Sequence, residues 1–260
     1  MFRTVKVDDA VLRYEVRGGS GRPALFLLNP LAASLEIWDA QLELEREFTL
    51  IRFDPRGHGG STLGSKAELT IEDLARDALA VLDAAAIERA HICGLSIGGM
   101  MAMNMAVRFP ARVQKLLLCA TTPYMPTREM WQARIDTARR DGLKDLVDGI
   151  VQRWFTPAFH DSNPGEVQRV RGLLMKTDRL GYAASAAAVR DMDQRESIKH
   201  ISAPTLVIAG AHDPGVPPSQ AETIINAVKG STLKVLESAH LPNIEQAGLF
   251  NSALKQFLVN

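Results

Sequence analysis

Residues 94–98 read Gly94-Leu95-Ser96-Ile97-Gly98, a Gly-x-Ser-x-Gly motif that lies between an apolar run at 90–93 and a helix-like stretch at 98–108. In a sharp turn from a strand to a helix, such a serine is held in a strained backbone conformation, with its hydroxyl exposed at the edge of a sheet. The glycines leave room for the strand and the helix to approach closely. Ser96 is therefore a candidate nucleophile.

Strand-like and helix-like segments alternate on both sides of this motif. Strands are expected at 11–18, 24–29, 48–54, 90–93, 113–120, 205–210 and 232–237, and helices at 33–47, 70–86, 98–108, 219–228 and 244–258. The strand segments are short and mostly apolar, which is typical of strands that are buried on both faces of a sheet. The alternation predicts an α/β fold with a mostly parallel central sheet and flanking helices.

The sequence changes in character between Pro123 and about His200. This segment has charged helical stretches, contains Trp131 and Trp154, and lacks a clear strand pattern. We expect a mostly helical insertion of roughly two to four helices that forms a cap. The predicted organisation is a core made of residues 1–122 and 201–260, with the cap at 123–200.

The composition excludes several classes of partner. The 30 basic and 30 acidic residues cancel, so the chain lacks the excess positive charge that binds nucleic acid or an anionic membrane. The first sixteen residues alternate like a strand, and no run approaches the ~20 apolar residues of a membrane span. We expect a soluble, cytoplasmic protein that binds a small-molecule substrate. Its oligomeric state stays open.

Metal and disulfide chemistry are not expected. Cys93 and Cys119 each lie inside an apolar run and are interpreted as buried thiols. The six histidines are scattered, and neither a Cys-x-x-Cys pair nor a His-Glu-x-x-His motif occurs. The sequence therefore predicts no metal site.

Two further residues can activate Ser96. A serine hydroxyl is a poor nucleophile at neutral pH, so it needs a nearby base, and that base needs a partner that fixes its tautomer. Asp213 follows the strand at 205–210, and His240 follows the strand at 232–237. The chain order of Ser96, Asp213 and His240 is the order that this type of fold requires. We expect these three residues to form a catalytic triad.

The remaining histidines fit other roles better than that of the base. They are His58, His91, His160, His200 and His212. His91 begins a strand, and His58 lies in a glycine-rich turn, where structural hydrogen bonds are expected. His160 and His200 lie in or beside the predicted cap. His212 adjoins Asp213 but precedes it, which places it badly for reaching the serine.

Acyl transfer also requires hydrogen-bond donors for the oxyanion of the tetrahedral intermediate. The backbone N–H of Ile97, next to Ser96 at the start of a helix, is one candidate. The second is expected in the loop after the strand at 24–29, where Leu31 is a better donor than Pro30 because proline has no N–H. Asn29 either orients this loop or is an ordinary turn asparagine.

With these motifs in place, the whole chain resembles the α/β-hydrolase superfamily. The matching features are Asp54-x-Arg56-Gly57-x-Gly59-x-Ser61, the GLSIGG sequence around Ser96, and the Asp213 and His240 loops. Within the superfamily, the chain is most similar to the 3-oxoadipate enol-lactonases of aromatic catabolism. These enzymes share a GLSxGGM turn, a WDAQ segment like residues 38–41, and a W-x-x-R-I helix like residues 131–135.

The resemblance implies hydrolysis of a small enol-lactone that bears a carboxylate, giving 3-oxoadipate in the β-ketoadipate pathway, without any cofactor or metal. A carboxylate needs a cation in the pocket, and the planar guanidinium of arginine suits it well. Arg134 lies three positions after Trp131, so both face one side of a cap helix. Trp131, Arg134 and Trp154 are the candidate substrate contacts. The alternative for the first two is a packing tryptophan and a solvated arginine.

Other readings of the same triad stay open. The loop at 29–33 differs from the Ser-Asn-Ser-Leu-Gly type of the lactonases, and Ala239 replaces the glycine that often precedes the histidine. The triad could instead serve a carboxylesterase, a cofactor-free perhydrolase or a hydrolase of carbon–carbon bonds in ring-cleavage products. A dehalogenase of this fold would need an acid at position 96. A ligand-binding receptor on the same fold is a remote alternative.

Overall fold

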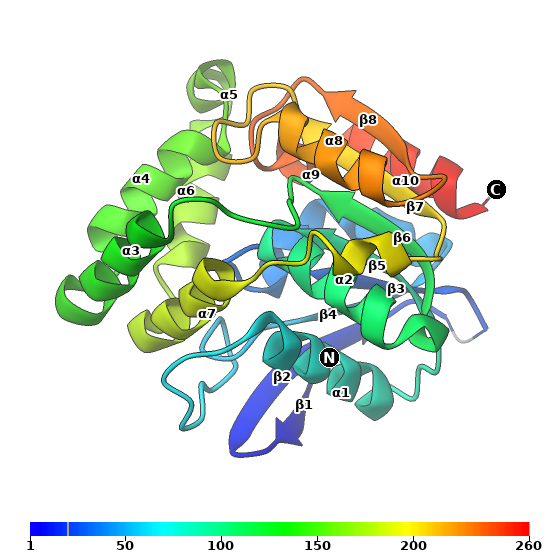
Figure 1. The fold of residues 1–260 in the computed structure, drawn as a ribbon, viewed down its shortest axis with the longest axis horizontal. Coiled ribbons are helices and arrows are strands. Elements are labelled where there is room, and N and C mark those ends of the chain that lie inside the picture. The colour runs from blue at the N-terminus through cyan, green and yellow to red at the C-terminus, as the bar shows by residue number, and fades with distance from the viewer. Residues whose placement is uncertain (20, 260) are drawn as a thin grey trace.

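A computed structural model describes residues 1–19 and 21–259, and these residues form an α/β structure around one sheet of eight strands (Figure 1). The strands are β1 (Phe2–Val7), β2 (Ala10–Arg17), β3 (Ala24–Leu28), β4 (Thr49–Phe53), β5 (Ala90–Leu95), β6 (Val113–Cys119), β7 (Thr205–Gly210) and β8 (Thr232–Leu236). Their order in the sheet is β1-β2-β4-β3-β5-β6-β7-β8. β2 pairs antiparallel with both β1 and β4. All other neighbouring strands, β4-β3-β5-β6-β7-β8, pair parallel, so the predicted mostly parallel sheet is confirmed.

The central strands are buried on both faces. Every residue of β3, β4, β5 and β7 is buried, which explains why these segments are nearly continuous apolar runs in the sequence. Cys93 on β5 and Cys119 on β6 are fully buried free thiols, as predicted. β5 lies near the middle of the sheet, so the turn that follows it lies near the middle of the edge formed by the carboxyl ends of the parallel strands.

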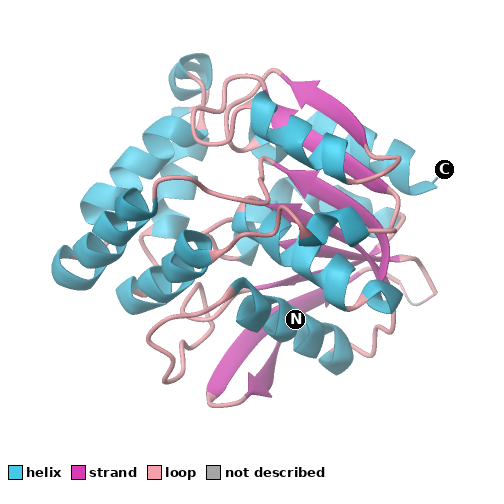
Figure 2. Ribbon diagram, in the orientation of Figure 1, coloured by secondary structure: helices cyan, strands magenta, loops and turns pink. Residues whose placement is uncertain are grey.

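Helices cover both faces of the sheet, as Figure 2 shows. The core helices are α1 (Ile71–Ala84), α2 (Ile97–Arg108), α8 (Pro218–Ala227), α9 (Pro242–Glu245) and α10 (Ala247–Val259), with short 3-10 segments η1 (Leu35–Arg46), η2 (Pro110–Arg112) and η3 (Ser197–His200). α1, α2 and α8 pack on one face, while η1, α9 and α10 lie on the other. The side chain of Thr70 caps α1 by accepting from the backbone of Asp73, where the sequence placed the helix start.

Two predicted helices differ in the structure. The helix expected at 33–47 is a 3-10 segment with a kink at Trp38, whose indole N–H donates to the Asn29 side chain at 3.0 Å. This tertiary hydrogen bond fixes Trp38 outside helical geometry. The helix expected at 244–258 is two helices, because Gln246 has non-helical backbone angles between α9 and α10.

The segment between β6 and β7 contains five α-helices, more than the two to four expected. They are α3 (Arg128–Asp141), α4 (Lys144–Trp154), α5 (Pro157–Ser162), α6 (Pro164–Leu174) and α7 (Arg179–Asp191). Pro157 and Pro164 each begin a new helix at its first position, where the missing N–H of proline costs nothing, so the region divides into shorter pieces.

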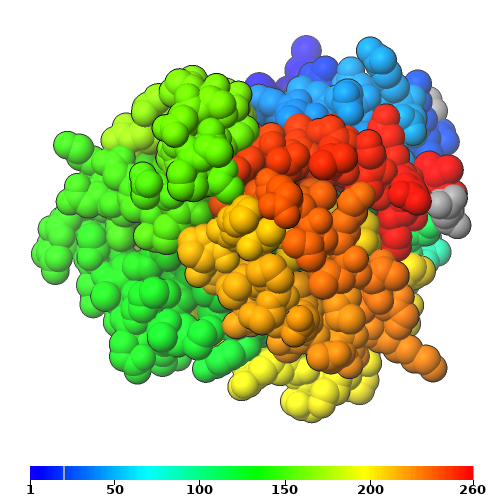
Figure 3. Space-filling model, turned by 90° about the horizontal axis from the view of Figure 1, so that it is seen from above, coloured from blue at the N-terminus to red at the C-terminus, as the bar shows by residue number. Residues whose placement is uncertain are grey.

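These helices gather at one end of the molecule, beside the carboxyl ends of the parallel strands (Figure 1). Seen from above, the green residues of α3 to α6 lie on the left of the molecule, directly against the C-terminal strands and helices (Figure 3). None of the described helices has the length and apolar character that crossing a membrane would require.

Candidate active site

Ser96 lies in the sharp turn between β5 and α2. Its backbone angles are φ 57° and ψ −120°, a conformation that is strained for any residue with a side chain. The Ser96 N–H donates to the carbonyl of Cys119 at 2.9 Å, and the Thr121 hydroxyl donates to the Ser96 carbonyl at 2.7 Å. Both peptide groups of Ser96 are therefore held by β6 and the residues just after it. The surrounding sheet maintains the strained turn.

The glycines of the motif allow three segments to meet around this turn. A β-carbon on Gly94 would lie 2.2 Å from the carbonyl oxygen of Gly98, and one on Gly98 would lie 2.2 Å from the carbonyl oxygen of Leu28. Distances this short exclude any side chain at either position. The start of α2 is therefore pressed directly against the end of β3 and the loop that follows it.

That loop carries the second candidate oxyanion donor. Ile97 is the first residue of α2, where helix N–H groups lack an intrahelical partner, and Leu31 lines the same cavity as Ser96. Ala32 adopts a positive φ of 67°, and its carbonyl accepts from the buried hydroxyl of Thr177 at 2.7 Å. The loop is thus fixed from the helical insertion as well as from the core.

Asn29 orients this loop, and the alternative of an ordinary turn asparagine is wrong. Its side-chain amide donates to the carbonyls of Phe53 at 2.9 Å and Ala33 at 3.3 Å. Its side-chain oxygen accepts from the indole of Trp38. The residue is fully buried, so its three hydrogen bonds tie the end of β3 to β4 and η1.

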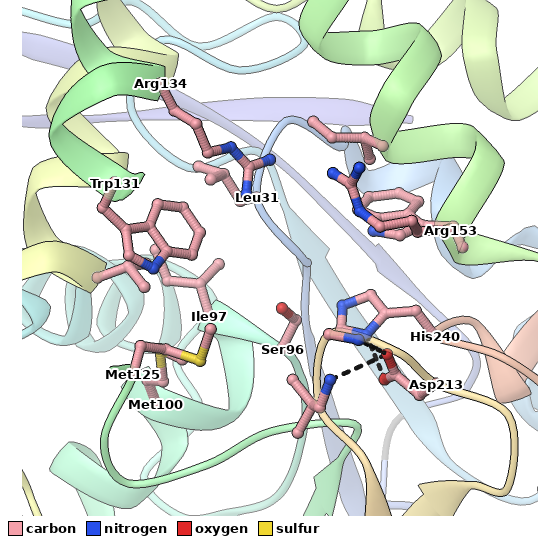
Figure 4. Close-up of a pocket in the computed structure, with 15 residues that line it drawn as sticks. Leu31, Ser96, Ile97, Met100, Met125, Trp131, Arg134, Arg153, Asp213 and His240 are labelled. Carbon is pink, nitrogen blue, oxygen red and sulfur yellow. Dashed lines mark hydrogen bonds and ion pairs between the residues drawn. The ribbon is translucent and has the colours of Figure 1, made fainter. Parts of the chain in front are cut away.

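Asp213 and His240 form the pair expected from the sequence. The Nδ1 atom of His240 lies 2.6 Å from Oδ2 of Asp213, and both side chains are nearly inaccessible to solvent. The other carboxylate oxygen of Asp213 accepts from the backbone N–H groups of Gly215 at 2.9 Å and Val216 at 3.0 Å. Three donors therefore fix the carboxylate, and the His240 ring presents its Nε2 edge toward the cavity that contains Ser96 (Figure 4).

One cavity contains the triad and the two candidate oxyanion donors. Its lining is mostly apolar, with polar groups at the triad and at the helical insertion: Leu31, Ser96, Ile97, Met100, Met125, Trp131, Arg134, Ile150, Arg153, Trp154, Val189, Asp213, Gly215, Val216 and His240. The triad and both candidate oxyanion donors thus share one cavity with the three predicted substrate contacts.

The predicted contacts from the insertion are paired as their spacing suggested. The guanidinium carbon of Arg134 lies 4.6 Å from the ring centroid of Trp131, a cation–π contact between neighbours on α3. The indole nitrogen of Trp131 is buried without a hydrogen-bond partner among the described residues. On the opposite wall, the ring of Trp154 packs 5.6 Å from the ring of His240.

Sequence reasoning missed Arg153, which lines the cavity from α4, facing Arg134 (Figure 4). Among the described residues, neither arginine makes a hydrogen bond or an ion pair with a carboxylate. Burial lowers the pKa of Arg153, and the positive charge of Arg134 lowers it further. Burial raises the pKa of the nearby Tyr182 hydroxyl, and the positive charge of Arg134 opposes this increase. No sequence signal distinguished Arg153 from the other arginines of the insertion.

None of the other five histidines lines this cavity. His58 Nδ1 bonds with the carbonyl of Arg56 at 2.8 Å, and burial lowers the pKa of His58 to about 4. His212 pairs at the surface with Glu237 at 2.8 Å. Within the described part of the chain, no three His, Cys, Asp or Glu side chains lie close enough together to hold a metal ion.

Known proteins resemble this chain over almost its whole length. Residues 23–247 match the family described as alpha/beta hydrolase fold. The chain is 34% identical to 3-oxoadipate enol-lactonase 2 of Acinetobacter baylyi, over 97% of this chain and 94% of that protein. The crystal structure of the enol-lactonase from Burkholderia xenovorans LB400 superposes with a TM-score of 0.96 at 32% identity, covering 99% of this chain and 100% of that one.

A second solved structure is equally similar in fold. A hydrolase from Pseudomonas aeruginosa PA01 superposes with a TM-score of 0.95 at 36% identity, over 99% of this chain and 98% of that one. The fold and the resemblance predicted from the sequence are thereby confirmed. The chain belongs to the α/β-hydrolase family and is a hydrolase that acts on carboxylic ester or lactone bonds.

Proposed function

We propose that this protein hydrolyses a small enol-lactone that carries a carboxylate, with 3-oxoadipate enol-lactone as the substrate and 3-oxoadipate as the product. The observation that carries the proposal is that one cavity contains a strained serine and a histidine–aspartate pair opposite two arginines, neither of which has a carboxylate partner among the described residues. Sequence identity of 32–34% to enol-lactonases supports the same substrate.

The proposed chemistry is acyl transfer through Ser96. His240 takes the hydroxyl proton as the Ser96 oxygen bonds to the lactone carbonyl carbon, and Asp213 stabilises the imidazolium. The N–H groups of Ile97 and Leu31 donate to the oxyanion. The bond from the carbonyl carbon to the enol oxygen then breaks, and His240 returns the proton to that oxygen.

The second half of the cycle releases the acid. Water attacks the acyl-enzyme with His240 as the base, and Ser96 is regenerated. The freed enol tautomerises to a ketone, which makes ring opening difficult to reverse. No metal or cofactor enters this scheme.

We assign the substrate carboxylate to Arg134 and Arg153. Two guanidinium groups that face each other in a partly buried cavity repel, and an anion between them relieves this repulsion. Guanidinium and carboxylate groups match in geometry, so the pair also orients the ring. Trp131 and Trp154 supply flat apolar walls on either side. In this assignment, residues 123–200 act as a cap domain over the core at 1–122 and 201–260.

The decisive experiment compares the purified protein with its Ser96→Ala variant on 3-oxoadipate enol-lactone and on a short-chain aryl ester. Fast loss of the lactone that depends on Ser96, with weak ester activity, is the expected result. Ester turnover without lactone turnover would retain the triad and reassign the protein as a general carboxylesterase. Full activity in Ser96→Ala would contradict the mechanism.

A further inference from the structure

Glu245 lies outside the cavity but accepts hydrogen bonds from both the His240 loop and the helical insertion. One carboxylate oxygen accepts from the backbone N–H of Ala239 at 3.0 Å, and Ala239 immediately precedes His240. The carboxylate also accepts from the hydroxyl of Thr156 and from its backbone N–H at 3.3 Å. Thr156 follows α4 and caps α5, so it belongs to the helical insertion.

A second link joins the same two segments on the other side of the histidine. The backbone N–H of Leu241 donates to the carbonyl of Trp154 at 3.3 Å. The rings of Trp154 and His240 also pack against each other, at 5.6 Å between centroids. Both chain neighbours of His240 are thus linked to residues 154–156. Ala239 is linked through the carboxylate of Glu245, and Leu241 is hydrogen-bonded directly to Trp154.

The position of the His240 ring depends on how its backbone is held. Asp213 fixes the ring through one nitrogen, a single hydrogen bond about which the ring can still tilt. The position of the ring along the cavity depends on its backbone, and that backbone is held by the end of α4. α4 also supplies Arg153 to the cavity wall.

We propose that Glu245 is a positioning residue that joins the end of α4 to the His240 loop, so that the base and the substrate-binding wall form one rigid unit. The proposal rests on the proposed function only in requiring Ser96 as the nucleophile and His240 as its base. Glu245 touches neither substrate nor reacting atoms. Its effect reaches the reaction through the placement of His240.

The test uses Glu245→Gln and Glu245→Ala in the full-length protein. Gln keeps the size of the side chain and one acceptor oxygen, while Ala removes the link. A misplacement of a catalytic group by about 1 Å can cost on the order of 100-fold in rate. We expect kcat on the aryl ester to fall about 10- to 100-fold in Glu245→Ala and less in Glu245→Gln, with KM changed little.

A second readout does not depend on the choice of substrate. A fluorophosphonate reacts with the serine by forming an oxygen–phosphorus bond, releasing fluoride and passing the hydroxyl proton to His240. Its labelling rate should fall in parallel with kcat. The Thr156→Val variant should reproduce part of the loss, and adding Glu245→Gln to it should cost less than in the wild type, because the two residues share one interaction.

Glu237→Gln is the matched control. This carboxylate lies eight residues before Glu245, is 80% exposed and, within the described part of the chain, pairs only with the side chain of His212 at the surface, so its variant should label at the wild-type rate. If the Glu245 variants melt at lower temperature but label and turn over normally while folded, Glu245 is merely structural and the proposal is wrong. If the wild type itself is not labelled, the serine mechanism fails instead.

Discussion

The Nδ1 atom of His240 lies 2.6 Å from Oδ2 of Asp213, while backbone N–H groups occupy the other oxygen of the same carboxylate. Because the two oxygens have different partners, the orientation of an asparagine side chain at position 213 can be predicted. The amide oxygen would stay with the two backbone donors, so the amide nitrogen would face the ring. His240 would then have to accept at Nδ1 and carry its proton on Nε2, the atom that must act as the base.

Asp213→Asn should therefore lower kcat by about 10⁴-fold while leaving the fold intact, because the histidine is held in the wrong tautomer. Steady-state kinetics, with circular dichroism as the folding check, measures both. The control is Asp193→Asn, which changes an exposed carboxylate that pairs with Arg195. A loss of less than tenfold in Asp213→Asn would show that the orientation of His240 does not depend on this carboxylate.

Gly98→Ala should disable the oxyanion site. The added β-carbon would lie 2.2 Å from the carbonyl oxygen of Leu28 and 2.8 Å from that of Asn29, so the loop that carries Leu31 must move away from Ile97. Losing one oxyanion donor costs about 10²- to 10³-fold in kcat, and a decrease of that size is expected.

Gly172→Ala is the control for this substitution. No atom of the described residues lies within 4 Å of its added β-carbon, and the residue is exposed on α6. It should raise the free energy of unfolding by about 0.5–1 kcal/mol through helix propensity, with activity unchanged. Equal activity in Gly98→Ala and Gly172→Ala would contradict the assignment of the loop.

The sequence was sufficient for the parts of this molecule that depend on local pattern. Apolar runs located the central strands, but β1 (Phe2–Val7), whose residues are mostly exposed, has no such run and was not among the expected strands. The turn around Ser96, the order of Asp213 and His240, and the spacing of Trp131 and Arg134 predicted residues that share one cavity. Arg153 could not be found this way, because facing Arg134 across a cavity is a tertiary relationship between two helices. The kink at Trp38 was missed for the same reason, since the indole N–H of Trp38 donates to the side-chain oxygen of Asn29, just after β3.

Thr177→Val should lower kcat as well as the free energy of unfolding. The hydroxyl of Thr177 donates to the carbonyl of Ala32 at 2.7 Å, next to the proposed donor Leu31. Its loss leaves a buried carbonyl unpaired, at a cost of about 1–3 kcal/mol, and frees the oxyanion loop. We expect a lower kcat with little change in KM.

Thr205→Val provides the comparison, because this buried hydroxyl also donates to a backbone carbonyl, that of Ala203 at 2.8 Å, at the far end of β7. Urea unfolding should show a similar loss of stability in both variants. Equal kcat values in the two folded variants would argue against a role for Thr177 in holding the loop.

His58 should make the protein less stable in mild acid. Burial lowers its pKa to about 4 from an ordinary value of 6.5, so the unfolded chain takes up the proton at a higher pH than the folded one. The free energy of unfolding therefore falls as the pH drops from 6.5 to 4, by about 3 kcal/mol for this group, and is unaffected above that window.

The variant His58→Asn removes this titration while keeping a donor near the position of Nδ1. It should lower stability at every pH by leaving a small void, but flatten the dependence of stability on pH between 6.5 and 4. Urea unfolding at pH 7.5 and pH 4.5 measures the difference. His91, whose pKa is also lowered to about 4 by burial, should still contribute its own decrease in both proteins.

Replacing either cavity arginine should lower the turnover of a carboxylate-bearing substrate much more than that of a neutral one. If Arg134 and Arg153 bind the substrate carboxylate, Arg134→Gln and Arg153→Gln should each lower kcat/KM for the enol-lactone by about 10- to 100-fold, since a hydrogen bond to a charged group contributes about 1.5–3 kcal/mol. Turnover of an uncharged aryl ester should change little, because neither residue contacts the reacting carbonyl.

Arg128→Gln on the same helix is the control, since Arg128 pairs with Asp191 at the surface. The double variant should lose less than the sum of the two single effects, because both guanidinium groups bind one anion and removing either relieves the repulsion on the other. If the charged and neutral substrates lose activity equally, the arginines support the cavity wall, and the carboxylate is bound elsewhere.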